Sequence, residues 1–582
     1  MKILILGGYG TFGGRLARLL ADDDRLTLVI GGRSQQRAAE FCSGLRAKAA
    51  LLALAFDRDG DVEAQLSAMK PDIVVDASGP FQSYGRDPYR VVRTALVLGI
   101  HYLDLADGSD FVKGIAKFDD EARARGVFVL SGVSSFPVLT AAVVRHLSRD
   151  LAQVQPISGG IAPSPYAGVG LNVIRAIASY AGKPVTLIRD GKQAVAYALV
   201  DTRRYTIAPP GRLPLKSRRF SLVDVPDFAV LPELWPGLRS IWMGAGPVPE
   251  ILHRALSALA WLVRFKVLPS LSSLAPSMHW ATNVLRWGEH RGGMYVVVEG
   301  VRDDGAVVER SWHLIAEGDD GPFIPSMAAE AIVRRCLDGR QPNPGARPAT
   351  NELELQDYEP LFARKQIFTG GRETSPEIAA QSLYRRLLED AWALLPLQIR
   401  QMHDFSHDFC AKGLATVEHG RGIIARLIAA IVGFSPAGND VAIEVSFRLR
   451  ERCEHWERIF AGQSFLSTQA AGHGRFEHFL RERFGPCVFG MALVIAGDRM
   501  RLVLRRWSFL GVPLPLSWAP FGDCYEHVKN GRFCFHVEIS HPLTGPIINY
   551  RGWLVPQETA SDSARQAAPN PALVRLGVEI PL

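Results

Sequence analysis

Short apolar runs alternate with stretches of helical spacing over the first 135 residues. The runs show no polar alternation, which is typical of parallel strands covered on both faces. Between them, apolar residues recur every three or four positions, as in helices that pack on one face. The runs are KILILGG (2–8), RLTLVIGG (25–32), KAALLALAFD (48–57), PDIVVDASGPF (71–81), IHYLDLA (100–106) and VFVLSG (127–132). The pattern predicts an α/β fold over 1–135, a doubly wound parallel sheet of the Rossmann type.

Glycines are concentrated between the first run and the first helical stretch. Glycine disfavours both strand and helix, so a cluster of glycines at this junction indicates a specific requirement. Three of them form G-x-G-x-x-G in the context of a dinucleotide-binding loop, after a strand and before a helix. There the backbone must approach a pyrophosphate closely. The candidate cofactor contacts in this loop are Gly8, Tyr9, Gly10, Thr11, Phe12 and Gly13.

The end of the second run indicates which dinucleotide binds. An NAD site usually places an acid about 20 residues after the glycines, at the ribose 2′-hydroxyl. This chain has Arg33 and Ser34 there and no carboxylate. Arg33 can pair with a 2′-phosphate, so we expect NADP. Asp57, at the end of the third run, is placed to contact the adenine.

Several segments, in order, resemble the saccharopine dehydrogenase-like (saccharopine reductase-like) oxidoreductases. They are GGYGTFGGRLARLL (7–20), GGRS (31–34), DIVVDASGPFQSYG (72–85), VVRTALVLGIHYLDLADGSDFV (91–112) and VLSGVSSFP (129–137). The resemblance implies that Ser78, Gly79 and Pro80 also hold NADP. It further implies that the GIHYLDL segment lies near the nicotinamide. Members often have Gly-Glu after this segment, whereas this chain has Ala106-Asp107-Gly108.

Candidate catalytic residues lie on that same segment. Successive side chains of a strand alternate in direction, so Tyr102 and Asp104 share one face and His101 lies on the other. Tyr102 and Asp104 form a candidate acid pair, and His101 is a third candidate. The alternative is that Asp104 caps the next turn while Tyr102 packs in the core.

Beyond residue 135 the pattern changes to antiparallel hairpins and helices. GMYVVVEGVRDDGAVVERSWHLIAEG (293–318) predicts a hairpin with a type I′ turn at Asp304-Gly305. This part resembles the α+β domain that the same enzymes use for substrate binding and pairing of subunits, which makes a homodimer one expected state. The expected organisation is a nucleotide-binding domain (1–135), this α+β domain (136–367), a linker (368–381), a C-terminal α+β domain (382–556) and a disordered tail (557–582).

The C-terminal part is expected to have helices to about residue 433 and mainly antiparallel strands after it. CYEHVKNGRFCFHVEIS (524–540) turns at Asn530-Gly531, the strongest short hairpin signal. This places Tyr525 opposite His536 and His527 opposite Cys534. No metal site is expected, because no further ligand loop accompanies these side chains. VEHGRG, WERIFAGQSF and INYRGWL resemble an uncharacterised domain that follows dehydrogenase-like domains in bacteria.

Composition narrows the function. Of the 582 residues, 47% are hydrophobic and 21% charged, and the net charge of +7 is spread without dense basic runs, so no nucleic-acid partner is expected. Seven loosely spaced cysteines predict reduced thiols in a cytoplasmic protein without a signal peptide. The apolar segment 251–274 is interrupted by charges too early to span a membrane. We expect it to be a buried core helix, and the alternative is an amphipathic helix that lines an apolar pocket or contacts the inner face of a membrane peripherally.

Together these features predict an NADP-dependent oxidoreductase. It would transfer hydride between NADPH and a C=N, C=C or C=O bond of a small or lipophilic metabolite. Two alternatives stay open: a nucleotide-binding scaffold without turnover, and a lipid-modifying reductase at a membrane surface.

Overall fold

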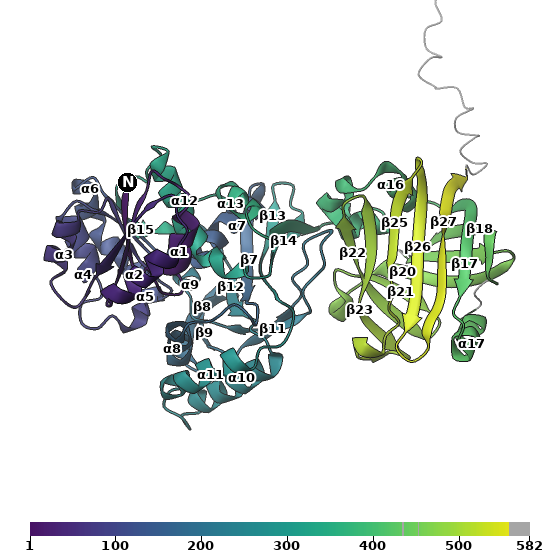
Figure 1. The fold of residues 1–582 in the computed structure, drawn as a ribbon, viewed down its shortest axis with the longest axis horizontal. Coiled ribbons are helices and arrows are strands. Elements are labelled where there is room, and N and C mark those ends of the chain that lie inside the picture. Colours follow the sequence, from purple (N-terminus) through teal and green to yellow (C-terminus); the bar gives the residue numbers. More distant parts are fainter. Residues whose placement is uncertain (433–435, 452, 558–582) are drawn as a thin grey trace, which may run out of the picture. The chain divides into compact units, whose positions relative to one another are not determined.

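The computed structural model describes residues 1–432, 436–451 and 453–557 and divides into two compact units (Figure 1). The first unit comprises Met1–Pro209 and Leu215–Ser375. The second comprises Pro210–Pro214 and the chain from Pro376 onward. The expected disordered tail lies, apart from residue 557, outside the described residues.

The first unit begins with a parallel sheet in the order β15-β6-β5-β4-β1-β2-β3. Its strands are β1 (Lys2–Leu6), β2 (Thr27–Gly32), β3 (Ala50–Ala55), β4 (Ile73–Asp76), β5 (His101–Asp104), β6 (Phe128–Ser131) and β15 (Gly345–Pro348). The intervening helices are α1 (Gly13–Leu20), α2 (Gln35–Gly44), α3 (Val62–Met69), α4 (Arg90–Val97), α5 (Ser109–Gly114) and α6 (Asp119–Ala124). The central strands are wholly buried between these helices, which confirms the predicted fold class.

The seventh strand does not come from the segment expected to form this sheet. β15 pairs in parallel with β6, with Gly345 opposite Phe128. The preceding helix, α12 (Ile324–Leu337), packs on α1, and its Ser326 hydroxyl donates to the carbonyl of Phe12 at 3.1 Å. Residues 1–135 therefore do not complete the sheet by themselves.

A second, mixed sheet of the same unit has the order β10-β11-β12-β7-β13-β14-β16. Its strands are β7 (Leu151–Ala162), β10 (Thr202–Tyr205), β11 (Arg218–Leu222), β12 (Ser240–Ala245), β13 (Arg291–Arg302), β14 (Val307–Glu317) and β16 (Ile367–Thr374). Its surroundings include α7 (Thr140–Leu147), α8 (Leu171–Tyr180), β8 (Pro184–Arg189), β9 (Lys192–Tyr197), α9 (Asp227–Leu234), α10 (Glu250–Arg264), α11 (Ala275–Val284) and α13 (Leu355–Ala363).

Two predictions for this region are wrong. The β13–β14 hairpin exists, but only Gly305 has a positive φ (84°), and the N–H of Gly305 donates to Arg302 across a longer turn. A type I′ turn needs positive φ at both central residues. The first half of the expected linker 368–381 is part of β16, which pairs with β14 through Ile367–Thr374.

The second unit is an antiparallel barrel of ten strands, closed by pairing of β22 with β23. The strands are β17 (Phe409–His419), β18 (Gly438–Arg450), β19 (Cys453–Phe460), β20 (Gln463–Ala471), β21 (Leu480–Phe484), β22 (Cys487–Ala496), β23 (Arg499–Phe509), β25 (Cys524–Lys529), β26 (Arg532–His541) and β27 (Gly545–Gln557). The helices include α15 (Leu383–Leu388), α16 (Leu397–His403) and α17 (Ile423–Val432).

The barrel confirms the mainly antiparallel C-terminal fold and one register in detail. Tyr525 pairs with His536 and His527 with Cys534, around positive φ at both Asn530 and Gly531. One expectation is wrong: β17 already lies between the leading helices α16 and α17, so the strands begin before residue 433.

Candidate functional site

The predicted cofactor residues gather at the carboxyl edge of the parallel sheet. Because β1 lies between β2 and β4, the loops that follow β1 and β4 diverge here, which is where ligands of such sheets bind. Gly7 has a φ of 72°, and a Cβ at this position would lie 2.8 Å from the carbonyl oxygen of Ala77. The two loops are therefore in direct backbone contact.

The glycine loop is packed without room for side chains. A Cβ at Gly8 would lie 2.8 Å from the carbonyl oxygen of Ile5, and one at Gly10 2.9 Å from that of Gly7. A Cβ at Gly13 would overlap the Gly7 carbonyl oxygen and lie 2.8 Å from its carbon. The first turn of α1 contains no acidic residue. Its leading N–H groups, which have no partner within the helix, suit a diphosphate by both geometry and charge.

Tyr9 lies across the end of β2. A Cβ at Gly32 would overlap the Tyr9 ring, 2.6 Å from Cζ, and the Tyr9 hydroxyl accepts the N–H of Ser34 at 3.1 Å. The Ser34 hydroxyl caps α2 by accepting the N–H of Arg37 at 3.3 Å. Arg33 is exposed beside this group. The guanidinium of Arg37 lies 5.8 Å from the Tyr9 ring centre.

The loop after β3 contributes a side chain that sequence reasoning missed. Asp57 is exposed and accepts the N–H of Asp59 at 3.0 Å, so it helps to shape this loop. Its neighbour Arg58 lies over the ring of Tyr84, and the buried Nε atom of Arg58 has no hydrogen-bond partner among the residues that the structure describes.

The segment after β4 is organised by Asp76. Oδ1 of Asp76 accepts the N–H of Ser78 at 3.0 Å and its hydroxyl at 2.6 Å. The Tyr84 hydroxyl lies 2.8 Å from that of Ser78 and 3.2 Å from the same carboxylate oxygen. These contacts hold the loop that carries Gly79 and Pro80 in place. They also engage the Ser78 hydroxyl in hydrogen bonds within the protein.

Tyr102 and Asp104 share a face of β5, as predicted, but lie below the surface. The Tyr102 hydroxyl is 3.5 Å from Oδ2 of Asp76, and burial raises its pKa far above the ordinary value. Oδ1 of Asp104 accepts the N–H groups of Ala106 (3.0 Å) and Gly132 (2.8 Å) and the hydroxyl of Ser131 (2.9 Å). Burial raises the Asp104 pKa to about 7. This geometry is that of a capped turn over a core tyrosine.

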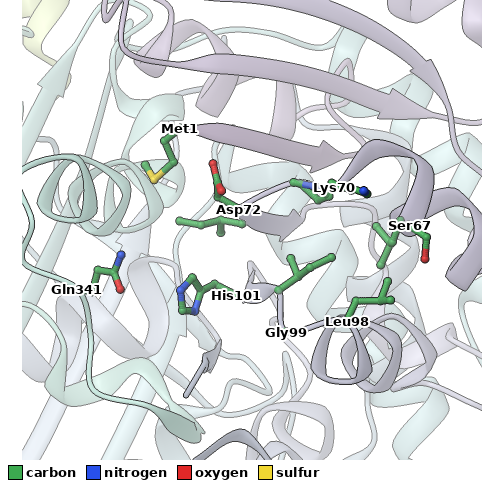
Figure 2. Close-up of a pocket in the computed structure, with 12 residues that line it drawn as sticks. Met1, Ser67, Lys70, Asp72, Leu98, Gly99, His101 and Gln341 are labelled. Carbon is green, nitrogen blue, oxygen red and sulfur yellow. The ribbon is translucent and has the colours of Figure 1, made fainter. Parts of the chain in front are cut away.

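His101 lies at the opposite edge of the sheet from the glycine loop. It is the first residue of β5, and its Nδ1 accepts the N–H of Phe128 at 3.2 Å. Its ring lines an open cavity of about 630 Å³ with Met1, Lys70 and Asp72 (Figure 2). A strand's amino end points away from the cofactor edge, so the structure does not bring His101 together with the other predicted residues.

A set of polar side chains at the carboxyl edge was missed by sequence reasoning. Nε2 of Gln82 donates to Asp107 at 3.0 Å, and Ser109 donates to Asp224 at 3.1 Å. Asp107 is exposed to water at this edge of the sheet. Loss of hydration raises the pKa of Asp107, and the charge of Asp224 adds to the shift. Burial, followed by the charges of Asp107 and Asp224, raises the pKa of Tyr180.

One segment of the second sheet's domain lies over the glycine loop. A Cβ at Gly170 would lie 2.5 Å from the Thr11 hydroxyl, and Arg15 donates to the carbonyl of Ala167 at 2.9 Å. At the start of α8, Nδ2 of Asn172 donates to the carbonyl of Gly79 at 3.1 Å. Segment 167–172 therefore contacts both α1 with its preceding loop and the loop after β4.

Comparisons with known proteins do not identify the chain. Residues 395–554 match the model of a domain of unknown function, DUF4166. A comparison with curated proteins finds no match. Among the described residues, no helix is long and apolar enough to cross a membrane.

Solved structures with similar folds share little sequence. Saccharopine dehydrogenase (L-Glu forming) from Saccharomyces cerevisiae is 13% identical, covers 64% of this chain and 100% of its own, and has a TM-score of 0.45. Biliverdin reductase from Synechocystis, in complex with biliverdin and NADP⁺, is 15% identical, covers 59% and 92%, and has a TM-score of 0.28. Likenesses this distant establish neither a family nor a reaction for this chain.

Proposed function

We propose that the chain is a nicotinamide-dinucleotide-dependent oxidoreductase that prefers NADP. The observation that carries this proposal is the glycine loop between β1 and α1. Its glycines leave no space for a Cβ, and it lies at the switch point of the parallel sheet. The packing explains why side chains are absent there, and the helix N-terminus supplies donors for a diphosphate.

The residues that would hold the cofactor are those of the loops at this edge. They are Gly8, Tyr9, Gly10, Thr11, Phe12, Gly13, Arg33, Ser34, Asp57, Ser78, Gly79 and Pro80. When bound, the nicotinamide would supply a hydride for a C=N, C=C or C=O bond of a small or lipophilic metabolite.

The exposed guanidinium of Arg33 supports the NADP preference. No carboxylate stands at the end of β2 to accept a ribose hydroxyl, and Gly32 has no room for one beside Tyr9. A guanidinium at this position pairs with a phosphate through charge-assisted hydrogen bonds. Such bonds contribute about 1.5–3 kcal/mol, which corresponds to roughly a tenfold to hundredfold difference in affinity.

Asp107, rather than Tyr102 or Asp104, is the proton donor that we favour. It is exposed to water at the carboxyl edge of the sheet, whereas Tyr102 and Asp104 are buried in structural contacts. Loss of hydration and the charge of Asp224 raise the pKa of Asp107, the direction that a proton donor requires.

The proposal is tested by titrating the full chain with NADPH and NADH calorimetrically. We expect NADPH to bind more tightly, and Arg33→Ala to remove about tenfold or more of that preference. Arg46→Ala, an exposed arginine just beyond α2, serves as the matched control and should leave it unchanged. If neither NADPH nor NADH binds, the proposal is overturned.

A turnover assay separates an enzyme from a scaffold that only binds the nucleotide. NADPH oxidation is followed with a panel of imines, enones and aldehydes. Asp107→Asn should lower kcat about tenfold or more and leave NADPH affinity unchanged, because general acids contribute on this scale. Binding without oxidation of NADPH by any acceptor would favour the scaffold.

A further inference from the structure

An exposed apolar surface remains on the first unit, away from its core. Its side chains come from α10, the residues just after it, α11 and the turn that follows. Figure 1 shows where the two helices lie in the fold. We call it the α10–α11 face, and its exposed side chains are Ile251, Trp261, Leu262, Phe265, Val267, Trp280, Val284 and Trp287. The exposed fraction reaches 65% for Phe265 and 64% for Trp280, values unusual for residues of this size.

The opposite side of α10 is firmly attached to the unit. Nε2 of His253, a buried residue, lies 2.7 Å from the hydroxyl of Ser221 on β11. A Cβ at Gly182 would overlap the carbonyl oxygen of Ala260 and lie 2.8 Å from Val263 Cβ. α11 packs on α8, which ends just before Gly182. The apolar side chains are therefore held outward by a well-packed support.

Basic side chains outnumber acidic ones on this face. Residues 251–288 contain Arg254, Arg264, Lys266 and Arg286 and no aspartate or glutamate. The nearest acid before this stretch, Glu250, is paired with Arg204 (2.6 Å) and Arg254 (2.7 Å). The nearest acid after it, Glu289, lies 3.7 Å from Arg291. Apart from Arg254, which is paired with Glu250, the basic side chains of residues 251–288 have no acidic residue within that stretch.

Aromatic and cationic side chains are interleaved on this face. The guanidinium of Arg264 lies 4.7 Å from the Trp261 ring centre, and the Trp261 and Phe265 rings stack at 5.3 Å. Trp280, Val284 and Trp287 follow each other at intervals of four and three residues, so the two on α11 share one side of the helix. Tryptophans beside lysine and arginine are typical of side chains that lie at the boundary between lipid headgroups and acyl chains.

We infer that the α10–α11 face docks the protein on the surface of an anionic lipid bilayer. The apolar and aromatic side chains would enter the interface, while the cations contact the headgroup phosphates. The excess positive charge of Arg264, Lys266 and Arg286 favours this occupant over a second copy of the chain, because pairing two such faces would bring like charges together. Docking of this kind needs neither cofactor nor turnover.

The test uses the full chain and vesicles sedimented by centrifugation. One vesicle type contains phosphatidylcholine with about a third phosphatidylglycerol, and the other contains phosphatidylcholine alone. We expect binding to the first type, about tenfold or more weaker binding to the second, and a decrease at high salt. No binding to anionic vesicles at low salt would overturn the inference.

Two variants separate the apolar from the ionic contribution. Phe265→Ser/Trp280→Ser/Trp287→Ser removes exposed aromatic area, and Lys266→Glu/Arg286→Glu reverses two charges. Each should weaken vesicle binding about tenfold or more. The matched control is Val307→Ser, because Val307 is 68% exposed in the β13–β14 hairpin, and it should bind as the unchanged chain does. Unaltered binding by both multiple variants would contradict the assignment of this face.

The same variants distinguish a bilayer from self-association. Sedimentation velocity without lipid reports the oligomeric state of the unchanged chain and of the aromatic variant. If the face docks on lipid, this state stays the same and only vesicle binding changes. A dimer that dissociates in the aromatic variant, with no vesicle binding by the unchanged chain, would overturn the inference. NADPH affinity, measured alongside, verifies that each variant is folded.

Discussion

The ring of Tyr9 lies directly against the backbone of Gly32, where a Cβ would be 2.6 Å from the Tyr9 Cζ. The Tyr9 hydroxyl, at the same place, accepts the N–H of Ser34 at 3.1 Å. The glycine loop and the end of β2 are thus joined by one aromatic side chain. Arg33 lies between Gly32 and Ser34 in the chain, and both of these neighbours contact Tyr9. The position of the Arg33 backbone therefore depends on the Tyr9 ring.

Gly32→Ala is expected to displace the Tyr9 ring and to weaken NADPH binding about tenfold. Tyr9→Ala/Gly32→Ala removes the collision, so the double variant should bind better than Gly32→Ala alone. Calorimetric dissociation constants for the four proteins give the coupling between the two positions. Strictly additive losses would contradict the contact as the cause.

Gly13→Ala is expected to abolish measurable NADPH binding and to lower stability, because its Cβ would overlap the carbonyl of Gly7. Overpacking of this kind costs about 1–3 kcal/mol. The control is Gly44→Ala at the end of α2, where a Cβ meets nothing within 4 Å. Urea unfolding and calorimetry on both variants measure the two effects, and equal behaviour of the two would contradict the packing argument.

The stability of the first unit should fall as pH rises from about 4 to about 7. Asp227 is fully buried, and burial raises its pKa to about 7. In this interval the unfolded chain has released a proton that the folded chain still holds, so deprotonation favours unfolding with a limiting slope of about 1.4 kcal/mol per pH unit for this group.

Asp227→Asn keeps the side chain neutral and should remove this contribution to the pH dependence. Urea titrations at pH 5, 6, 7 and 8 compare the slopes, with the exposed Asp120→Asn as control. The raised pKa of Asp104 leaves a residual slope in the variant. An identical slope in Asp227→Asn and the unchanged chain would refute the prediction.

The second unit contains both a buried and an exposed ionisable pair, and their contributions to stability can be compared. Nε2 of His403, which is wholly buried on α16, lies 2.7 Å from Oε2 of Glu526 on β25. Glu526→Ala leaves that imidazole nitrogen without its acceptor, which costs about 1–3 kcal/mol. Glu418→Ala breaks the exposed pair with Arg551 at 3.2 Å and should cost about 1 kcal/mol or less.

Hydrogen exchange of β25 and urea unfolding measure both variants in the full chain. Faster exchange in β25 only for Glu526→Ala is the expected outcome. Similar losses in the two variants would show that burial of the His403 pair does not govern its contribution.

Local patterns predicted the parts of the fold that local chemistry determines. The apolar runs and the glycine loop indicate the parallel sheet, because buried strands and a tight strand-to-helix turn need those residues. Asn530-Gly531 predicts its hairpin register because both residues tolerate positive φ. Asp304-Gly305 predicts the same kind of turn but does not form it, because only the glycine has a positive φ.

Long-range pairing was not readable from the sequence. FTGGRET (368–374) has the composition of a loop, yet it forms β16 because β14 offers an edge for pairing. Asp107 and Asp224 lie close enough for the charge of one to raise the pKa of the other, although they are more than a hundred residues apart in the chain. The expectation that His101 lies with the other candidate catalytic residues fails for a different reason. Strand periodicity predicts which face a side chain occupies, but the distance from the strand's carboxyl end decides whether it reaches a ligand.

The late arrival of β15 has a consequence for synthesis of the protein on the ribosome. The nucleotide-binding sheet receives its last strand from residues 345–348, some two hundred residues after β6 has emerged. Until then, the nascent chain exposes the unpaired edge of β6, a template for wrong pairing with other chains. Chaperone engagement during translation should therefore persist until this segment has left the exit tunnel.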